Sequence, residues 1–265
     1  MHATRLNPDV SVIHDALEVP GLGFLPVNAF VLHAEQPLVV DTGVGLPDRH
    51  FLDVLADVIA PEDVRWIYLT HPDRDHTGGI FDLLEAAPDA RLITTFVGAG
   101  IMSVETPLPM PRLYFLNAGQ SLDLGDREVT AFRPPLFDNA ATLGLYDSKS
   151  GTLFSSDCFG APLASEADAL ADDASVVGAE LAQRQALWTS VDSPWVHTAD
   201  PMRFGATLEP IRRFDPTVIL STHLPPAIGR TSEFLATAAQ APGTDPFVGP
   251  DQAALEAMLA QFEPV

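Results

Sequence analysis

Cations and sulfur are scarce in this chain of 265 residues. Acidic residues outnumber basic ones 36 to 14, which gives a formal net charge of −22, and Lys149 is the single lysine. No basic face can be assembled from so few cations, so the sequence argues against nucleic acid and an anionic membrane surface as partners. Cys158 is the single cysteine, which excludes an intrachain disulfide and a cage of thiolate metal ligands.

Long apolar runs are also missing. No run approaches the roughly 18 residues of a membrane span, and the polar start of the chain has no apolar core of a signal peptide. We therefore expect a soluble, cytoplasmic protein. With 46% hydrophobic residues the chain can bury one or two cores. Because no segment has the composition of a linker, we expect one domain over residues 1–265.

Apolar periodicity predicts hairpins mixed with strand–helix alternation. The three expected hairpins pair residues 29–32 with 38–40, 121–124 with 128–132, and 142–146 with 152–154. Further strands are predicted over 10–13, 65–70, 91–95 and 217–220, and helices over 48–59, 78–87, 165–190, 202–214, 231–240 and 251–262. This order favours an α/β fold in which two sheets pack face to face with helices outside, rather than a doubly wound parallel sheet.

One predicted loop, residues 70–79 (THPDRDHTGG), concentrates the chemistry. Four potential metal ligands fall within six residues there: His71, Asp73, Asp75 and His76. A loop can turn all of these side chains toward one point, which a regular strand or helix cannot do at these spacings. Gly78 and Gly79 allow a tight turn into the next helix. A solvated surface loop is the alternative, and this density of ligands after a buried strand disfavours it.

The loop resembles the motif of the metallo-β-lactamase superfamily, which reads His, a variable residue, His, a variable residue, then Asp-His. Asp73 stands where the motif has its second histidine. Three other pieces are similar and occur in family order: the hairpin and Asp-Thr-Gly turn within 27–43, the strand ending at Asp157, and the strand ending at His223. The resemblance implies an αββα sandwich of the metallo-β-lactamase type over nearly the whole chain.

A carboxylate at the position of Asp73 resembles one branch of the superfamily, the flavodiiron proteins and their relatives, which usually carry Glu there. Residues 154–160 (FSSDCFG), 193–196 (SPWV) and 221–225 (STHLP) are similar to that branch as well. The few residues after His223 leave no room for the flavin-binding domain that follows this unit in flavodiiron proteins. The resemblance therefore implies a flavodiiron-like protein without the flavodoxin domain.

The resemblance also implies a ligand set, with one substitution. The branch has a histidine in the segment that here reads RPPLFDNAA (133–141), and Asp138 occupies its position with Asn139 beside it. Asp138 is the better ligand because a carboxylate binds a hard cation more strongly than an amide does; an ordinary turn aspartate is the alternative. The implied ligands are His71, Asp73, Asp138 and Asp157 for one metal, and Asp75, His76, Asp157 and His223 for the other, with Asp157 bridging.

Three imidazoles and four carboxylates favour hard, oxygen-loving ions, so we expect two iron ions, with manganese or zinc as alternatives. The first hypothesis is redox chemistry on dioxygen, nitric oxide or peroxide, with electrons from a separate donor protein or an organic substrate. A non-catalytic oxygen-binding or sensing protein would carry the same site, so enzymatic activity is left open. The other hypotheses are a metal-dependent hydrolase of a small ester or lactone and a degenerate site. The oligomeric state, a homodimer included, is also open.

Three further residues have predicted supporting roles. Asp41 is expected to accept the second ring proton of a ligand histidine, with a buried turn aspartate as the alternative. Cys158 is expected to point away from the metals as a small buried hydrophobe. The resemblance places His197 over the site entrance, and we expect it to pack rather than to line the pocket.

Overall fold

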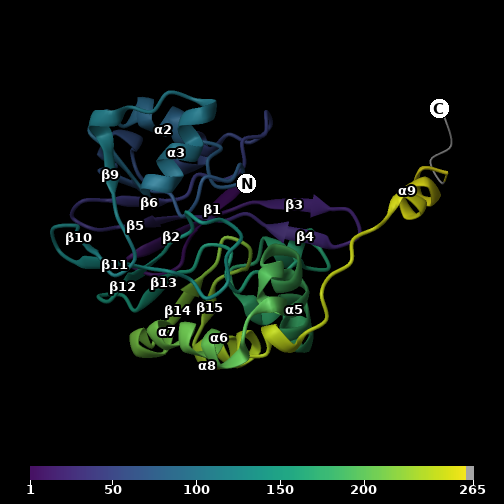
Figure 1. Cartoon of the computed structure of the whole chain (residues 1–265). Helices are drawn as coiled ribbons and strands as arrows, with labels where there is room; N and C mark the ends of the chain where they lie inside the picture. Colours follow the sequence, from purple (N-terminus) through teal and green to yellow (C-terminus); the bar gives the residue numbers. More distant parts are fainter. Residues whose placement is uncertain (261–265) are drawn as a thin grey trace.

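The computed structural model describes residues 1–260. Two β-sheets pack face to face, and helices cover the outer face of each sheet (Figure 1). This arrangement confirms the predicted αββα sandwich. Among the described residues, no helix combines the length and the apolar character that crossing a bilayer requires.

The first sheet has seven strands and carries three helices. In spatial order its strands are β1 (His2–Arg5), β2 (Val10–His14), β5 (Ala29–Leu32), β6 (Leu38–Val40), β7 (Trp66–Tyr68), β8 (Arg91–Thr94) and β9 (Leu113–Phe115). The predicted β5–β6 hairpin is present, and β6 to β9 run parallel. The helices α1 (Phe51–Ala56), α2 (Ile80–Ala86) and α3 (Phe96–Glu105) lie in the connections between these strands.

The second sheet has six strands, β10 (Ser121–Asp123), β11 (Glu128–Phe132), β12 (Gly144–Asp147), β13 (Thr152–Phe154), β14 (Val218–Leu220) and β15 (Ala227–Ile228). Both predicted hairpins form here, and β13 pairs with β14 in parallel. Its helices are α4 (Glu166–Ala169), α5 (Leu181–Asp192), α6 (Pro201–Thr207), α7 (Glu209–Phe214) and α8 (Thr231–Ala238). A separate two-stranded sheet pairs β3 (Ala16–Val19) with β4 (Gly23–Pro26). Short 3₁₀ turns lie at Pro61–Asp63, Met110–Arg112, Ala174–Glu180, Pro194–Thr198 and Ala241–Gly243.

The alternation of side chains along each strand builds the layers. In β5, Phe30 and Leu32 face the other sheet and join a core cluster that includes Phe154 of β13. Ala29 and Val31 point the opposite way, into the cluster beneath α1 to α3. Because successive residues of a strand face opposite sides, each central strand serves two cores.

Two predicted helices are broken in the structure. The predicted helix 165–190 is three pieces, because Ser165 caps α4, Asp173 caps a 3₁₀ segment, and Gly178 has a φ of 61° that no helix contains. The predicted helix 202–214 is interrupted between α6 and α7, where Pro210 has no N–H to continue the ladder. The strands β1, β3, β4, β9 and β15 and the helix α3 were not predicted, because most of these elements are short and only partly buried.

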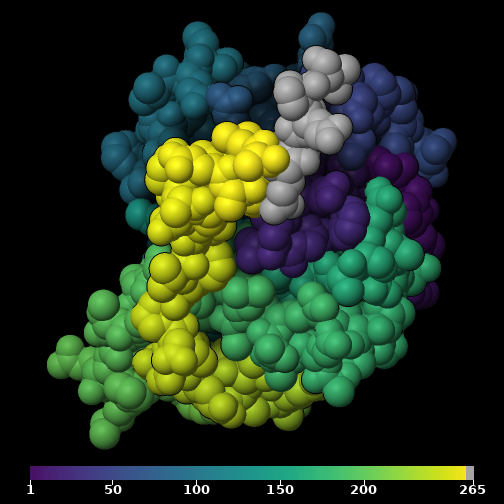
Figure 2. Space-filling model, turned by 90° about the vertical axis from the view of Figure 1, so that its right-hand side faces the viewer, coloured from purple at the N-terminus to yellow at the C-terminus, as the bar shows by residue number. Residues whose placement is uncertain are grey.

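The helix α9 (Gln252–Leu259) follows an extended segment and stands away from the two sheets (Figure 1). Figure 2, turned to face that side, shows α9 in yellow in front of the body. None of its residues is buried. It begins close to the start of the predicted helix 251–262, and the last two residues of that prediction lie outside the described residues.

A buried guanidinium joins the two sheets. The side chain of Arg127 donates at 2.7 Å to Asp9, which directly precedes β2. It also donates at 3.0 Å to Asp126 in the β10–β11 turn and to Asp147 at the end of β12. Arg127 is 7% exposed and Asp147 is fully buried. The charge is therefore balanced on three sides, and the hydrogen bonds use most of the donors of the fork.

We predict that Arg127→Ala lowers the free energy of unfolding by about 3 kcal/mol, because it leaves the Asp147 carboxylate buried without its cation. Chemical denaturation followed by circular dichroism measures the change. The control is Arg212→Ala, which removes an exposed pair with Glu209 and should cost less than about 1 kcal/mol. Equal effects of the two substitutions would contradict a role of Arg127 in joining the sheets.

Candidate metal centre

The loop between β7 and α2 is held in place by close backbone contact. The amide of Gly78 donates to the Gly43 carbonyl at 2.8 Å, and a Cβ at Gly78 would lie 2.3 Å from the backbone nitrogen of Gly45. A Cβ at Gly79 would lie 2.6 Å from the ring of Phe51. Glycine is therefore needed at both positions for lack of space. The predicted tight turn into α2 has this steric origin.

The structure brings seven predicted site residues together at one end of the two sheets. Four come from the loop after β7, one from the β11–β12 connection, and two from the ends of β13 and β14. Their donor atoms form overlapping groups within 4.8 Å of one another: His71, His76 and Asp157; Asp75, His76 and His223; and His71, Asp73 and Asp138.

Asp157 lies at the middle of this arrangement and is 3% exposed. Its Oδ1 is 3.1 Å from Nε2 of His76 and 3.3 Å from Nε2 of His223. Its Oδ2 is 3.3 Å from Nε2 of His71. Burial opposes a charge on this carboxyl, but the three imidazoles outweigh burial and hold the pKa of Asp157 well below its usual range. The two oxygens thus face two different groups of side chains.

The group on the Oδ2 side contains His71, Asp73 and Asp138. Nε2 of His71 is 3.8 Å from a carboxylate oxygen of Asp73 and 3.7 Å from one of Asp138. Burial, followed by the charges of Asp157 and Asp73, raises the pKa of Asp138 to about 7. The neighbouring Asn139 donates from its Nδ2 to a carboxylate oxygen of Asp73 at 3.0 Å. Of the two candidate ligands in this segment, Asp138 therefore lies beside His71, and Asn139 forms a hydrogen bond that holds Asp73.

The group on the Oδ1 side contains Asp75, His76 and His223. A carboxylate oxygen of Asp75 is 3.6 Å from Nε2 of His76 and 3.4 Å from Nε2 of His223. Burial opposes protonation of His223, but the negative charges of Asp157 and Asp75 raise its pKa to about 9. In the metal-free protein, protons on these imidazoles balance the carboxylates, so cation binding would release them.

Asp41 orients His76 from below, as the sequence predicts. Its Oδ2 lies 2.8 Å from Nδ1 of His76 and also accepts the hydroxyl of Thr70 at 2.8 Å. Its Oδ1 accepts the backbone amide of Thr70 at 2.8 Å. Asp41 is 1% exposed and has a φ of 55°, so the turn and the orienting role coexist in one residue. A carboxylate behind an imidazole fixes its ring and raises its basicity as a ligand.

The other two imidazoles are held in the same manner. Nδ1 of His223 lies 2.7 Å from the Pro26 carbonyl, at the end of β4. Nδ1 of His71 lies 3.2 Å from the hydroxyl of Ser156. Each ring therefore has a partner on its Nδ1 side, and each Nε2 is directed to the centre.

Two buried atoms at the centre have no hydrogen-bond partner among the described residues: Nε2 of His76 and Oδ1 of Asp157. They lie 3.1 Å apart, but their geometry forms no hydrogen bond. Buried polar atoms without partners indicate an absent ion or water. Three imidazole nitrogens and four carboxylates around these atoms are a donor set that fits divalent cations.

Sequence reasoning missed two neighbours of the centre, both on α5. The carboxyl of Asp192 has an oxygen within 4.8 Å of oxygens of Asp138 and Asp157, and burial with the charge of Asp157 raises its pKa to about 8. The indole of Trp188 packs against the ring of His223 at a centroid distance of 4.9 Å. Neither residue belongs to a local motif, so only the tertiary structure reveals them.

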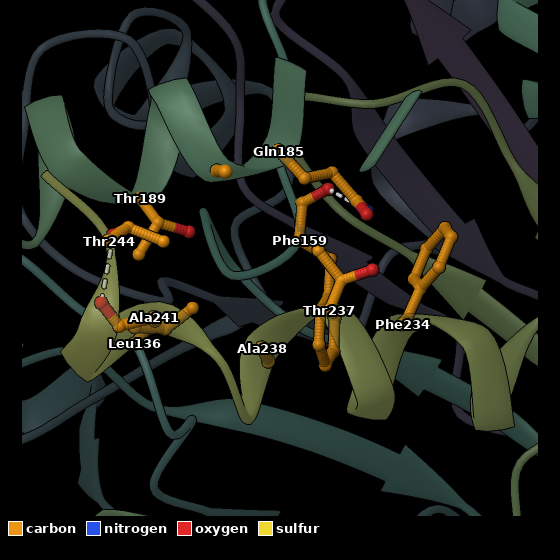
Figure 3. Close-up of a pocket in the computed structure, with 10 residues that line it drawn as sticks. Leu136, Phe159, Gln185, Thr189, Phe234, Thr237, Ala238, Ala241 and Thr244 are labelled. Atoms are coloured by element: carbon orange, nitrogen blue, oxygen red, sulfur yellow. Dashed lines mark hydrogen bonds between the residues drawn. The ribbon is translucent and has the colours of Figure 1, made fainter. Parts of the chain in front are cut away.

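Cys158 and His197 lie outside the centre. Cys158 is 1% exposed within the core beneath α5 to α8, as predicted. Nε2 of His197 lies 3.1 Å from the hydroxyl of Ser190, which agrees with the packing interpretation. Figure 3 shows the crevice between α5 and α8, where Gln185 donates to the Phe159 carbonyl at 3.0 Å. The crevice offers only about 10 Å³, the space of one water at most, so it is a packing defect and not a ligand site.

Comparison with known proteins finds one matching family and several similar proteins of the flavodiiron type. Residues 25–199 match the family described as ODP family beta lactamase. The "Putative diflavin flavoprotein A 1" of Nostoc sp. is 28% identical over 134 residues, which are 50% of this chain and 23% of that protein. The "Anaerobic nitric oxide reductase flavorubredoxin" of Salmonella typhi is 25% identical over 134 residues, 50% of this chain and 28% of that protein. The matches thus span about a quarter of the length of these relatives.

Solved structures show the same fold. The rubredoxin oxygen:oxidoreductase of Desulfovibrio gigas superposes with a TM-score of 0.78 at 17% identity, over 93% of this chain and 63% of that one. The flavodiiron protein of Giardia intestinalis gives a TM-score of 0.76 at 15% identity, over 91% and 59%. A fragment of putative diflavin flavoprotein A 5 from Nostoc sp. gives 0.73 at 16% identity, over 91% and 96%.

We predict that Asp41→Asn weakens Fe²⁺ binding by about tenfold to a hundredfold, because an amide cannot supply the carboxylate charge behind His76. Anaerobic competition with a chromogenic chelator measures the affinity. The control is Asp53→Asn, an exposed position on α1, which should leave the affinity unchanged. A thermal melt of each variant separates lost binding from lost folding. An unaltered affinity in a folded Asp41→Asn protein would show that the charge of Asp41 does not strengthen metal binding through His76.

Proposed function

The chain belongs to the family described as ODP family beta lactamase, and on that basis we propose that it holds two metal ions and binds or reduces dioxygen, nitric oxide or peroxide. The supporting observation is the convergence of imidazole and carboxylate donors on the two oxygens of Asp157. One ion would be held by His71, Asp73 and Asp138, the other by Asp75, His76 and His223, with Asp157 between them.

The donor set favours iron over zinc. Four carboxylates balance the charge of two divalent cations, and oxygen-rich sites suit hard ions and their higher oxidation states. Structural zinc sites take more nitrogen or sulfur than this set offers. Relatives described as a nitric oxide reductase, an oxygen:oxidoreductase and flavodiiron proteins support the same chemistry. When bound, iron would supply the change of oxidation state that no side chain of this chain provides.

The protein would contribute a rigid and largely dry site. His71, His76 and His223 are at most 2% exposed, and each is fixed through its Nδ1 atom. Trp188 covers one side of His223 and donates its indole N–H to the Asp157 carbonyl at 3.3 Å. The side chain of Asp73 is 43% exposed, and those of Asp75 and Asp138 are each 27% exposed. Access for a small molecule is therefore on the side of these three carboxylates.

We propose a diatomic gas or another small molecule as the substrate, and a separate protein as the electron donor. Reduction of a gas consumes electrons, and the site residues themselves supply none. Oxygen binding without turnover remains the alternative within the same chemistry. A homodimer remains a prediction.

We predict about two irons per chain after expression with iron, measured by elemental analysis. Asp157→Ala should remove both ions, because each relies on one oxygen of that carboxylate. Asp138→His should retain both, since an imidazole is a competent donor at that place. Asp53→Ala, on the surface of α1, is the matched control.

Two results would contradict this proposal. Loss of a single ion in Asp157→Ala would show that Asp157 does not bridge. Zinc in place of iron, together with turnover of a chromogenic ester or lactone, would favour the hydrolase over redox chemistry.

A further inference from the structure

A groove of about 580 Å³ lies between the second sheet and the helices α6 and α7, and none of the seven metal-site residues lines it. Its volume is in the range of pockets that hold small organic ligands. Four aromatic and two cationic side chains dominate its lining: Phe132, Arg133, Phe137, Trp195, Arg213 and Phe214.

The charge of the groove is opposite to that of the protein. Its lining contains two arginines and no aspartate or glutamate, in a chain with a formal net charge of −22. Neither arginine forms an ion pair within residues 1–260, whereas Arg212, next to Arg213 on the same helix, pairs with Glu209. Two unneutralised guanidinium groups therefore give this groove a local attraction for anions that the rest of the surface opposes.

The aromatic side chains of the groove pack against one another in two pairs. The rings of Phe137 and Trp195 are 5.0 Å apart at an angle of 40°, and the Trp195 indole donates to the Phe137 carbonyl at 2.7 Å. The rings of Phe132 and Phe214 are 5.7 Å apart. The guanidinium of Arg133 lies 5.2 Å from the centre of the Phe137 ring. Fixed rings beside guanidinium groups suit a planar aromatic ligand with a negative charge.

We propose that this groove binds a small aromatic carboxylate, with its ring among the aromatic side chains and its carboxylate toward Arg133 and Arg213. Phe137 lines the groove and immediately precedes Asp138, so the ligand would lie beside the metal centre without using its donors. This binding goes beyond the proposed redox function and needs no metal ion.

The test uses the full chain, with and without iron, and two probes of matched shape. Calorimetry should show that 2-naphthoate binds at least about fivefold more tightly than 2-naphthamide, because only the carboxylate engages the arginines. Arg213→Ala should weaken naphthoate about fivefold and leave naphthamide unchanged. The matched control is Arg212→Ala, which should change neither.

The variant at residue 213 carries the test because Arg213 is exposed and makes no ion pair in the described part of the chain. Arg133→Ala should have the same effect, but Arg133 also donates to the Thr142 carbonyl and its loss can disturb the fold. Equal binding of the two probes, equal effects of the substitutions at 212 and 213, or no heat of binding at about 1 mM naphthoate would each overturn the proposal. Binding that requires iron would also overturn it, because the probe would then be a metal ligand.

Discussion

A single buried carboxylate governs the geometry of this protein's site. Asp157 can keep its charge in the interior only because three imidazoles surround it. Those imidazoles come from the ends of strands in both sheets, so the balance of charge at Asp157 also fixes how the sheets meet at this edge. Each ring directs its Nε2 toward Asp157, so its Nδ1 lies on the opposite side of the ring. There the Nδ1 atoms contact Asp41, the Pro26 carbonyl and Ser156.

The topology explains why distant residues meet. Asp157 and His223 follow β13 and β14, which pair in parallel, so their carboxyl ends lie at the same edge of the sheet. The loop carrying His71 and His76 follows β7, in the middle of the parallel part of the other sheet. Loops at the carboxyl ends of neighbouring strands lie close together, so short loops are enough to bring the site residues into contact. The strands and helices themselves form the hydrophobic core.

The sequence predicted what is encoded locally. The loop at 70–79 carries its ligands within a few residues, and three hairpins are visible as apolar runs around turns. Long-range features escaped prediction: Asp192 and Trp188 come from a helix with no motif, and the groove combines side chains that are far apart in the chain. The helix break at Gly178 was missed because the alanine-rich composition around it favours helix overall. The break before Pro210 was missed because apolar residues recur at helical spacing on both sides of it.

The position of the loop at residues 70–79 depends on the contact between Gly78 and the turn at Gly43 and Gly45. The two backbones touch with no side chain between them to absorb a displacement. A displacement of the turn at Gly43 and Gly45 would therefore also displace the loop that carries His76. Asp41 precedes this turn and contacts the ring of His76, so it would be displaced together with the ring. A displacement of this edge of the first sheet would therefore change the distance from His76 to the second sheet before it changed the contact between His76 and Asp41.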